Sequence, residues 1–178
     1  SAVSLYRRSY DLFACGGILF NHESERRGER FVTRKISRYV ADLYWATQTG
    51  RSIPRLKLGN LSAQRDWGHA EDYVEAMWMM LQHDYADDFV ISTGNTYSVE
   101  DYLKEAFKCI NIVEYMDHVE IDESLMRPSE VPYLRGISKK AERRLGWKPK
   151  MGFENLVSRM VQYDIQNNDV YKKDHTTT

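Results

Sequence analysis

The sequence predicts an α/β fold that contains at least some parallel strands. Short apolar runs with the length of strands alternate with longer segments in which apolar residues recur at helical spacing. Glycines follow several of these segments, as expected where a helix or strand ends. No internal repeat, low-complexity linker or composition shift interrupts the alternation, so we expect residues 1–178 to form a single region.

The first strand is predicted at Leu12–Phe20. This run is almost wholly apolar and contains two glycines, which is typical of a strand buried on both faces of a parallel sheet. Ser1–Asp11, before it, has helical character but no N-cap, as in a helix that is already under way. The polar stretch Asn21–Arg30 is predicted to be a loop at the carboxyl end of the strand.

Further elements follow from periodicity and capping signals. Ser98, with Asp101 three residues later, predicts a capped helix start, and Met77–Met80 together with Trp78 are expected to pack in the core. The other helices are predicted at about Thr33–Thr49, around Val74–Leu81, between a Ser138 cap and Gly146, and from Phe153 onward. Short strands are predicted at Leu56–Leu58, Asp88–Thr93 and Val119–Ile121.

The composition excludes several classes of protein. The 25 Lys and Arg residues nearly balance the 26 Asp and Glu residues, which argues against a general nucleic-acid or anionic-membrane binder. No apolar run approaches the roughly 20 residues that a membrane-spanning helix requires. The two cysteines form no CxxC pair, and no leader pattern opens the chain, so we expect a reducing compartment and a cytoplasmic protein.

Complete catalytic motifs are missing from the sequence. The glycines never take the spacing of a dinucleotide-binding turn or a P-loop, and no GxSxG elbow is present. None of the twelve tyrosines is followed four residues later by lysine, and the five histidines show no metal-ligand spacing. We therefore expect no metal site and no catalytic residue within this chain.

Residues suited to binding an anionic ligand are present. Arg65 lies in QRDWGH before a helix, and Arg127 lies in RPSE, three residues before Glu130. Arginine can hold phosphate in a bidentate manner, and a carboxylate can accept both hydroxyls of a ribose. Asn21 follows a strand, where ligands of α/β proteins bind. Without further information, the two arginines could equally form surface ion pairs, Glu130 could be a surface acid, and Asn21 could cap a turn.

Five motifs together resemble the GDP-mannose 4,6-dehydratase family. They are GGILFNHES at 16–24, FVTRKIS at 31–37, QRDWGHAEDYVEAMW at 64–78 after an LGN, RPSEV at 127–131 and LGWKP at 145–149. QRDWGHAEDYVEAMW is the most specific. The resemblance implies the C-terminal part of an extended short-chain dehydrogenase with a Rossmann-like fold. That part would be an incomplete parallel sheet with a small mixed α/β substrate-binding lobe.

The resemblance also implies a reaction. The family oxidises GDP-mannose at C4 with NADP, eliminates water across C5 and C6, and returns the hydride to C6. The product is GDP-4-keto-6-deoxymannose, the precursor of GDP-fucose and GDP-rhamnose. Members assemble as dimers or tetramers, so GDP-mannose and other copies of the chain are the expected partners.

Site residues carry over from the family position by position. In substrate binding, Asn21 would contact the diphosphate or the sugar, and Arg65 and Arg127 would bind the diphosphate. Val32 and Lys35 would contact the nucleotide, and Glu130 would hold the ribose. Gly59 and Asn60 would border the guanine pocket. His22 and Arg27 would contact NADP. The resemblance places the NADP-binding half and the catalytic residues upstream of Ser1. Pro132 departs from the family, which usually has Asp after RPxEV.

Alternatives to these roles stay open. His22 could be an ordinary loop histidine, Arg27 a subunit-interface residue and Lys35 a solvated lysine. The whole chain could instead belong to another nucleotide-sugar epimerase, reductase or dehydratase. It could also be a non-catalytic GDP-sugar-binding or assembly module.

Overall fold

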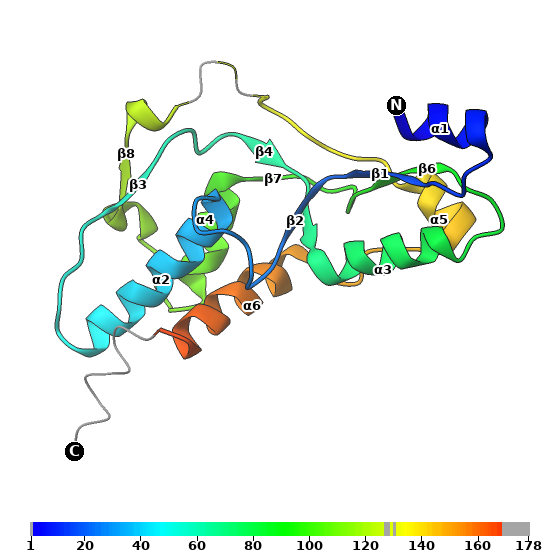
Figure 1. Ribbon diagram of the computed structural model, residues 1–178. Helices are drawn as coiled ribbons and strands as arrows, with labels where there is room; N and C mark the ends of the chain where they lie inside the picture. Colours follow the sequence, from blue (N-terminus) through cyan, green and yellow to red (C-terminus); the bar gives the residue numbers. More distant parts are fainter. Residues whose placement is uncertain (1, 127–128, 130, 169–178) are drawn as a thin grey trace. The chain divides into compact units, whose positions relative to one another are not determined.

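A computed structural model describes residues 2–126, 129 and 131–168, which fold into two compact units (Figure 1). Each unit is assembled from three separate stretches of the chain. Unit 1 combines Ser1–Glu23, Arg65–Thr96 and Tyr133–Phe153, and unit 2 combines Ser24–Gln64, Tyr97–Pro132 and Glu154–Thr178.

Unit 1 is built on two pairs of parallel strands. β1 (Gly16–Leu19) pairs with β6 (Asp88–Ile91), and β2 (Asn21–Glu23) pairs with β5 (Trp67–His69). Phe20, the single residue between β1 and β2, donates its N–H to the carbonyl of Ile91 at 3.0 Å. The second pair therefore begins directly at the carboxyl end of β1.

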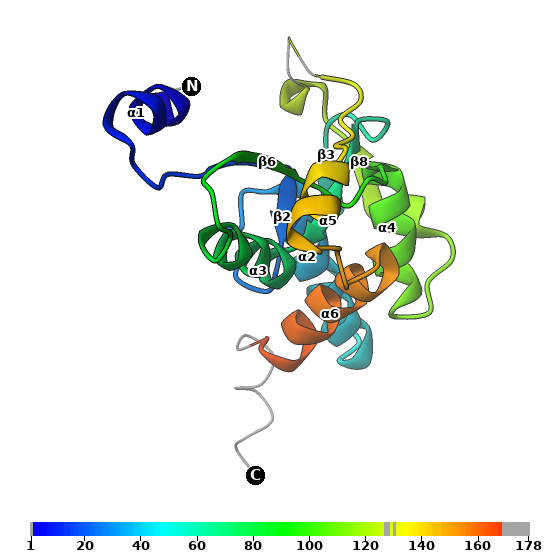
Figure 2. The same ribbon diagram turned by 90° about the vertical axis from the view of Figure 1, so that its right-hand side faces the viewer.

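Helices α3 (Ala70–Leu81) and α5 (Lys139–Leu145) contribute to the core of unit 1. Its buried residues are Tyr73, Ala76, Met80, Phe89, Ile91, Ala141 and Trp147. Gly146, with φ of 70°, ends α5 in the left-handed conformation that glycine favours. Helix α1 (Ala2–Tyr10) has no buried residue and stands away from the strand pairs of unit 1 (Figure 2).

Unit 2 consists mainly of three helices that lie beside one another, α2 (Val32–Gln48), α4 (Val99–Lys108) and α6 (Phe153–Gln166) (Figure 1). Their apolar faces share a core, and the Tyr102 hydroxyl contacts the Met160 sulfur at 3.3 Å. A parallel pair of strands, β3 (Leu56–Leu58) and β8 (Val119–Ile121), adjoins this core. The remaining elements are β4 (Gln64–Arg65), β7 (Tyr97–Ser98) and 3-10 helices at Tyr115–His118 and Glu123–Leu125.

Most elements confirm the predictions from sequence. The helix predicted at Thr33–Thr49 is α2, and the predicted strands at Leu56–Leu58 and Val119–Ile121 are β3 and β8. Ser98 and Asp101 form a reciprocal capping box at the start of α4. In the part of the chain that the structure describes, no helix is both long enough and apolar enough to cross a membrane.

Four predictions differ from the structure. The strand predicted at Leu12–Phe20 is observed only as β1, and Ile18 is 58% exposed rather than buried, because its side chain projects from a face of the strand pair that is open to solvent. The predicted loop at Asn21–Arg30 begins with strand β2. Of the stretch Met77–Met80, Met80 is buried as predicted, but Met77 and Trp78 are exposed because the buried face of α3 is formed by Tyr73, Ala76 and Met80. Ser138 precedes α5, but its side chain makes no capping hydrogen bond.

Candidate functional site

Polar residues of unit 1 gather where its parallel strands end. Asn21 and His22 follow β1, whereas Thr93 and Gly94 follow β6. Arg65 and Asp66 lead into β5, whose Trp67 and Gly68 stand opposite Asn21 and His22 in the register. We use the name strand-end cluster for six of these residues: Asn21, His22, Arg65, Asp66, Thr93 and Gly94. Because the carboxyl ends of parallel strands are where α/β proteins bind ligands, the cluster is the candidate site of unit 1.

His22 is held in a defined orientation within the cluster. Its Nδ1 lies 2.8 Å from the carbonyl oxygen of Phe20, and its ring stacks on the ring of Tyr73 with centroids 4.9 Å apart. A carbonyl oxygen can only accept a hydrogen bond, so Nδ1 carries the proton in this contact. Nε2 is then the ring nitrogen that can accept a hydrogen bond from a ligand. His22 thus lies in a strand rather than in a mobile loop.

Tyr73 supports His22 from a fully buried position. Burial raises the pKa of the Tyr73 hydroxyl well above its usual value, and the nearby carboxylates of Asp66, Asp72 and Glu23 raise it further. The phenol therefore stays neutral over the physiological range. Its contribution to the site is a rigid, uncharged surface beneath His22.

Gly68 allows Tyr73 to approach β5 closely. A Cβ atom at Gly68 would lie 2.6 Å from Cε2 of Tyr73 and 2.9 Å from the methyl group of Thr93. Any larger residue would push the tyrosine ring away from the strand. The glycine in the QRDWGH motif is thus explained by packing beneath the cluster.

The Asp66 side chain accepts several hydrogen bonds within unit 1 and is completely buried. Its Oδ1 accepts hydrogen bonds from the backbone N–H of Thr93 at 2.8 Å and from the Thr93 hydroxyl at 2.7 Å. Its Oδ2 accepts from the N–H groups of Gly94 at 2.9 Å and Gly136 at 3.1 Å. One carboxylate therefore joins three separate stretches of chain.

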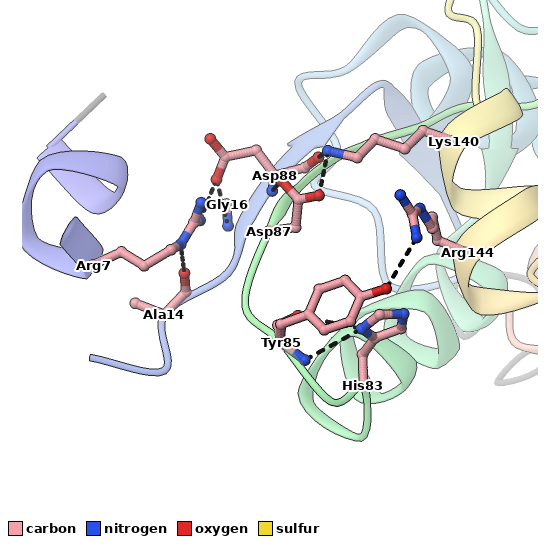
Figure 3. A network of polar contacts seen from close by, with 9 residues as sticks. All are labelled: Arg7, Ala14, Gly16, His83, Tyr85, Asp87, Asp88, Lys140 and Arg144. Carbon is pink, nitrogen blue, oxygen red and sulfur yellow. Dashed lines mark hydrogen bonds and ion pairs between the residues drawn. The ribbon is translucent and has the colours of Figure 1, made fainter. Parts of the chain in front are cut away.

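A second polar network lies at the opposite, amino end of β1 and β6 (Figure 3). Arg7 of α1 pairs with Asp88 at 2.5 Å, and the same carboxylate accepts the N–H of Gly16. Lys140 of α5 pairs with Asp87 at 2.6 Å. These contacts tie α1 and α5 to the first residues of the two strands, so we assign the network a structural role.

In unit 2, three of the predicted residues lie near the carboxyl end of β3. The Lys35 ammonium donates to the carbonyl of Lys57 at 2.6 Å. A Cβ atom at Gly59 would lie 2.7 Å from the carbonyl oxygen of Leu125, so glycine is needed for this close approach of two backbones. Asn60 accepts two hydrogen bonds from Ser62, which shapes the turn after the strand.

The other two predicted residues of unit 2 are near the start of α2. The Arg27 guanidinium lies 3.5 Å from the centre of the Phe31 ring, a cation–π arrangement that holds the side chain in place. Val32 is the first residue of α2 and is half-buried. Lys35 lies one turn further along the same helix.

The structure thus separates the predicted site residues into two sets. Asn21, His22 and Arg65 come together in unit 1, and the five others just described belong to unit 2. Arg127 and Glu130 lie outside the described residues. Sequence reasoning missed Asp66 and Thr93. The signal for Asp66 was an acid directly after the arginine in QRDWGH, in a segment that leads into a helix.

The polar side chains of the strand-end cluster include a charged donor and a ring-nitrogen acceptor. Among the residues that the structure describes, no three His, Cys, Asp or Glu side chains come together as metal ligands would. Within unit 1, His22 offers an acceptor nitrogen, and Arg65 offers a charged donor that matches phosphate. Such groups suit a ligand that contains phosphate.

Comparison with known proteins places the chain in a family. The model of the family described as GDP-mannose 4,6 dehydratase matches residues 1–160. GDP-mannose 4,6 dehydratase 1 from Arabidopsis thaliana is 51% identical over 161 residues, covering 90% of this chain and 43% of that protein. The Homo sapiens GDP-mannose 4,6 dehydratase is 45% identical over 177 residues, covering 90% and 46%. The chain spans less than half the length of these two relatives.

A solved structure gives the same result for the fold. RMD from Pseudomonas aeruginosa, complexed with NADPH, superposes with a TM-score of 0.79 at 17% identity, covering 93% of this chain and 52% of that one. The predicted α/β, Rossmann-like fold class is thereby confirmed, and the chain corresponds to about half of that structure. On the strength of the family match and the relatives, this chain belongs to the GDP-mannose 4,6-dehydratase family.

Proposed function

We propose that this chain supplies the substrate-binding region of an NADP-dependent GDP-mannose 4,6-dehydratase, a lyase that forms GDP-4-keto-6-deoxymannose. The observation that carries the proposal is the family match over residues 1–160. The strand-end cluster supports it, because Asn21, His22 and Arg65 of the family motifs lie together where a ligand would bind. In this proposal residues 1–178 act as one substrate-binding region, and another polypeptide segment supplies the NADP-binding half.

Roles for individual residues follow from their chemistry. Arg65 binds the diphosphate, with Arg127 as a second clamp, and Glu130 holds the ribose. Val32 and Lys35 contact the nucleotide, and Gly59 and Asn60 border the guanine. Asn21 orients the diphosphate or sugar, while His22, through Nε2, and Arg27 contact NADP. NADP, when bound, supplies a reversible acceptor for the hydride of the sugar.

Calorimetry with the purified chain tests the substrate class. We expect GDP-mannose to bind more tightly than UDP- or dTDP-sugars, and Arg65→Ala to weaken binding about tenfold. Arg143→Ala is the matched control, because Arg143 is exposed on α5 and its side chain donates to the carbonyl of Lys139 in the same helix. Tighter binding of a UDP- or dTDP-sugar would favour another nucleotide-sugar enzyme.

A turnover assay and the coding sequence test the enzymatic part. The 178-residue chain with added NADP should not convert GDP-mannose, because Tyr-x-x-x-Lys and the glycine-rich turn do not occur in it. An upstream reading frame that encodes both motifs would support the dehydratase. A start codon near Ser1 would support the alternative, a non-catalytic module that binds GDP-sugar.

We also propose that the native protein is a cytoplasmic homo-oligomer. The two free cysteines support a reducing compartment, which localisation of a fluorescently tagged protein would test. Val74, Trp78 and Leu81 form an exposed apolar face on α3, with exposed fractions of 61%, 63% and 59%. Such a face favours self-association. Light scattering at high concentration should show oligomers that Trp78→Glu reduces, and a monomeric wild-type chain would contradict this part.

A further inference from the structure

We infer that Asp66 is a positioning residue for Arg65, the residue to which the proposed function assigns a phosphate contact. The inference rests on that function, because it concerns how a ligand-binding side chain of the same site is held. Asp66 follows Arg65 directly in the chain and is fully buried, whereas Arg65 is half-buried. Fixing the position of Asp66 therefore fixes the backbone from which the Arg65 side chain extends.

The acceptor capacity of Asp66 is used by protein donors. An ionised carboxylate offers about four acceptor positions. The structure fills them with four donors at 2.7 to 3.1 Å, of which three are backbone N–H groups. Backbone donors cannot change rotamer, so the carboxylate has one preferred position. An amide in its place would turn an N–H group toward these donors and lose part of the set.

The segments that Asp66 joins all border the strand-end cluster. Thr93 and Gly94 follow β6, and Gly94 has φ of 82°, a conformation that suits glycine. Gly136 packs so tightly on Ser92 that a Cβ atom there would lie 2.2 Å from the Ser92 Cβ. The neighbouring Arg135 donates to the carbonyl of Gly94 at 2.6 Å. Asp66 thus anchors the backbone at Arg65 to segments that are also linked to each other.

Asp72 provides a matched comparison within unit 1. It is 5% exposed, and its Oδ2 accepts hydrogen bonds from the backbone N–H groups of Lys150 at 3.0 Å and Met151 at 3.1 Å. The chemistry is the same as at Asp66, but the segment that it fixes follows α5 rather than bordering the cluster. Losing this carboxylate should therefore lower stability without affecting Arg65.

Binding measurements on five forms of the chain test the inference. Calorimetry measures the Kd for GDP-mannose of each form. The five forms are wild type, Arg65→Ala, Asp66→Asn, Asp72→Asn and the double variant that combines Arg65→Ala with Asp66→Asn. We expect Asp66→Asn to raise Kd about tenfold and the double variant to bind no more weakly than Arg65→Ala. Asp72→Asn should lower the thermal midpoint and leave Kd within about twofold. Fully additive losses in the double variant would overturn the inference, as would an unchanged Kd for folded Asp66→Asn.

A second variant and a second readout cover the remaining outcomes. If Asp66→Asn does not fold, Thr93→Val removes one donor of the same carboxylate and should raise Kd about two- to threefold. The order parameter of the Arg65 Nε–H, measured by NMR in the absence of ligand, should fall in the Asp66 or Thr93 variant and not in Asp72→Asn. Unchanged order would refute the positioning role by itself. A different outcome is that the order parameter of Arg65 falls in the Asp66 variant while the wild-type chain does not bind GDP-mannose. That result would refute the proposed function and retain the positioning role.

Discussion

Unit 2 buries the apolar faces of its helices, whereas unit 1 exposes much of its apolar surface to solvent. Val40 of α2, Leu103 of α4 and Met160 of α6 are each 0% exposed. In unit 1, Ile18 of β1 is 58% exposed and Trp78 of α3 is 63% exposed. A parallel strand pair is normally covered on both faces and continued by further strands. The contrast therefore indicates that the helices of unit 2 cover one another, while unit 1 has apolar surface available for another segment or chain.

The largest expected effect comes from truncating a core residue of unit 2. Leu103→Ala should lower the free energy of unfolding by about 2–5 kcal/mol, because it removes buried contacts and leaves a cavity. Trp78→Ala should change it by less than about 0.5 kcal/mol in monomeric protein, because the indole is exposed. Urea denaturation measures both. Equal losses would show that α3 depends on Trp78 and would end the contrast between the units.

Gly68→Ala probes the part of unit 1 that is tightly packed. The added methyl group would meet the Tyr73 ring at 2.6 Å, and we expect a loss of about 1–3 kcal/mol in the free energy of unfolding. Gly17→Ala is the control, because its nearest neighbour would be Leu19 at an ordinary 3.4 Å. If both variants unfold at the same urea concentration, the packing beneath the strand-end cluster is not rigid.

Helix capping gives a smaller effect. Ser98→Ala removes the capping box of α4 in unit 2 and should cost about 1 kcal/mol. The corresponding serine of unit 1, Ser138, makes no side-chain cap to α5, so Ser138→Ala should cost clearly less. Thermal unfolding followed by circular dichroism distinguishes the two. A larger loss for Ser138→Ala would contradict the assignment.

The smallest effects are opposite pH dependences of two aspartates. In unit 2, burial raises the pKa of Asp164 above 3.8, although Ser37 and Arg34 partly offset this. Folded Asp164 therefore binds its proton more tightly than unfolded Asp164, and its stabilising contribution is lost as pH rises through its folded pKa. In unit 1, the hydrogen bond from Lys140 lowers the pKa of Asp87 below 3.8. Its contribution is present above pH 3.8 and lost as pH falls through the folded pKa.

Thermal midpoints between pH 2.5 and about 6.5 test this pair of signs. Relative to wild type, Asp164→Asn should gain stability as pH rises, whereas Asp87→Asn should lose it. Parallel curves for the two variants would show that one of the assigned causes is wrong. The same data check that both proteins remain folded across the range.

Local signals predicted elements well where the determinants lie within one turn of chain. Gly146 and the Ser98–Asp101 pair marked helix ends correctly, because capping depends on residues close in sequence. The buried face of α4 is formed by Tyr102, Leu103, Ala106 and Phe107, which follow the capped start at helical spacing. The buried face of α3 was predicted only in part: Met80 is buried but Trp78 is exposed, because Val74, Trp78 and Leu81 are as periodic as Tyr73, Ala76 and Met80. Periodicity identifies a helix, and only its neighbours decide which apolar side is covered.

The sequence by itself determined the alternation of strands and helices, the family and the candidate residues of the binding region. The tertiary structure alone decided that β2 continues from β1, that Asn21 and His22 stand opposite β5, and that Gly68 must be small. It also revealed Asp66, whose partners Thr93 and Gly136 are 27 and 70 residues away. Contacts at such separations are set by chain topology, which no local pattern of residues encodes. That is why Arg65 was recognisable from its motif and the carboxylate beside it was not.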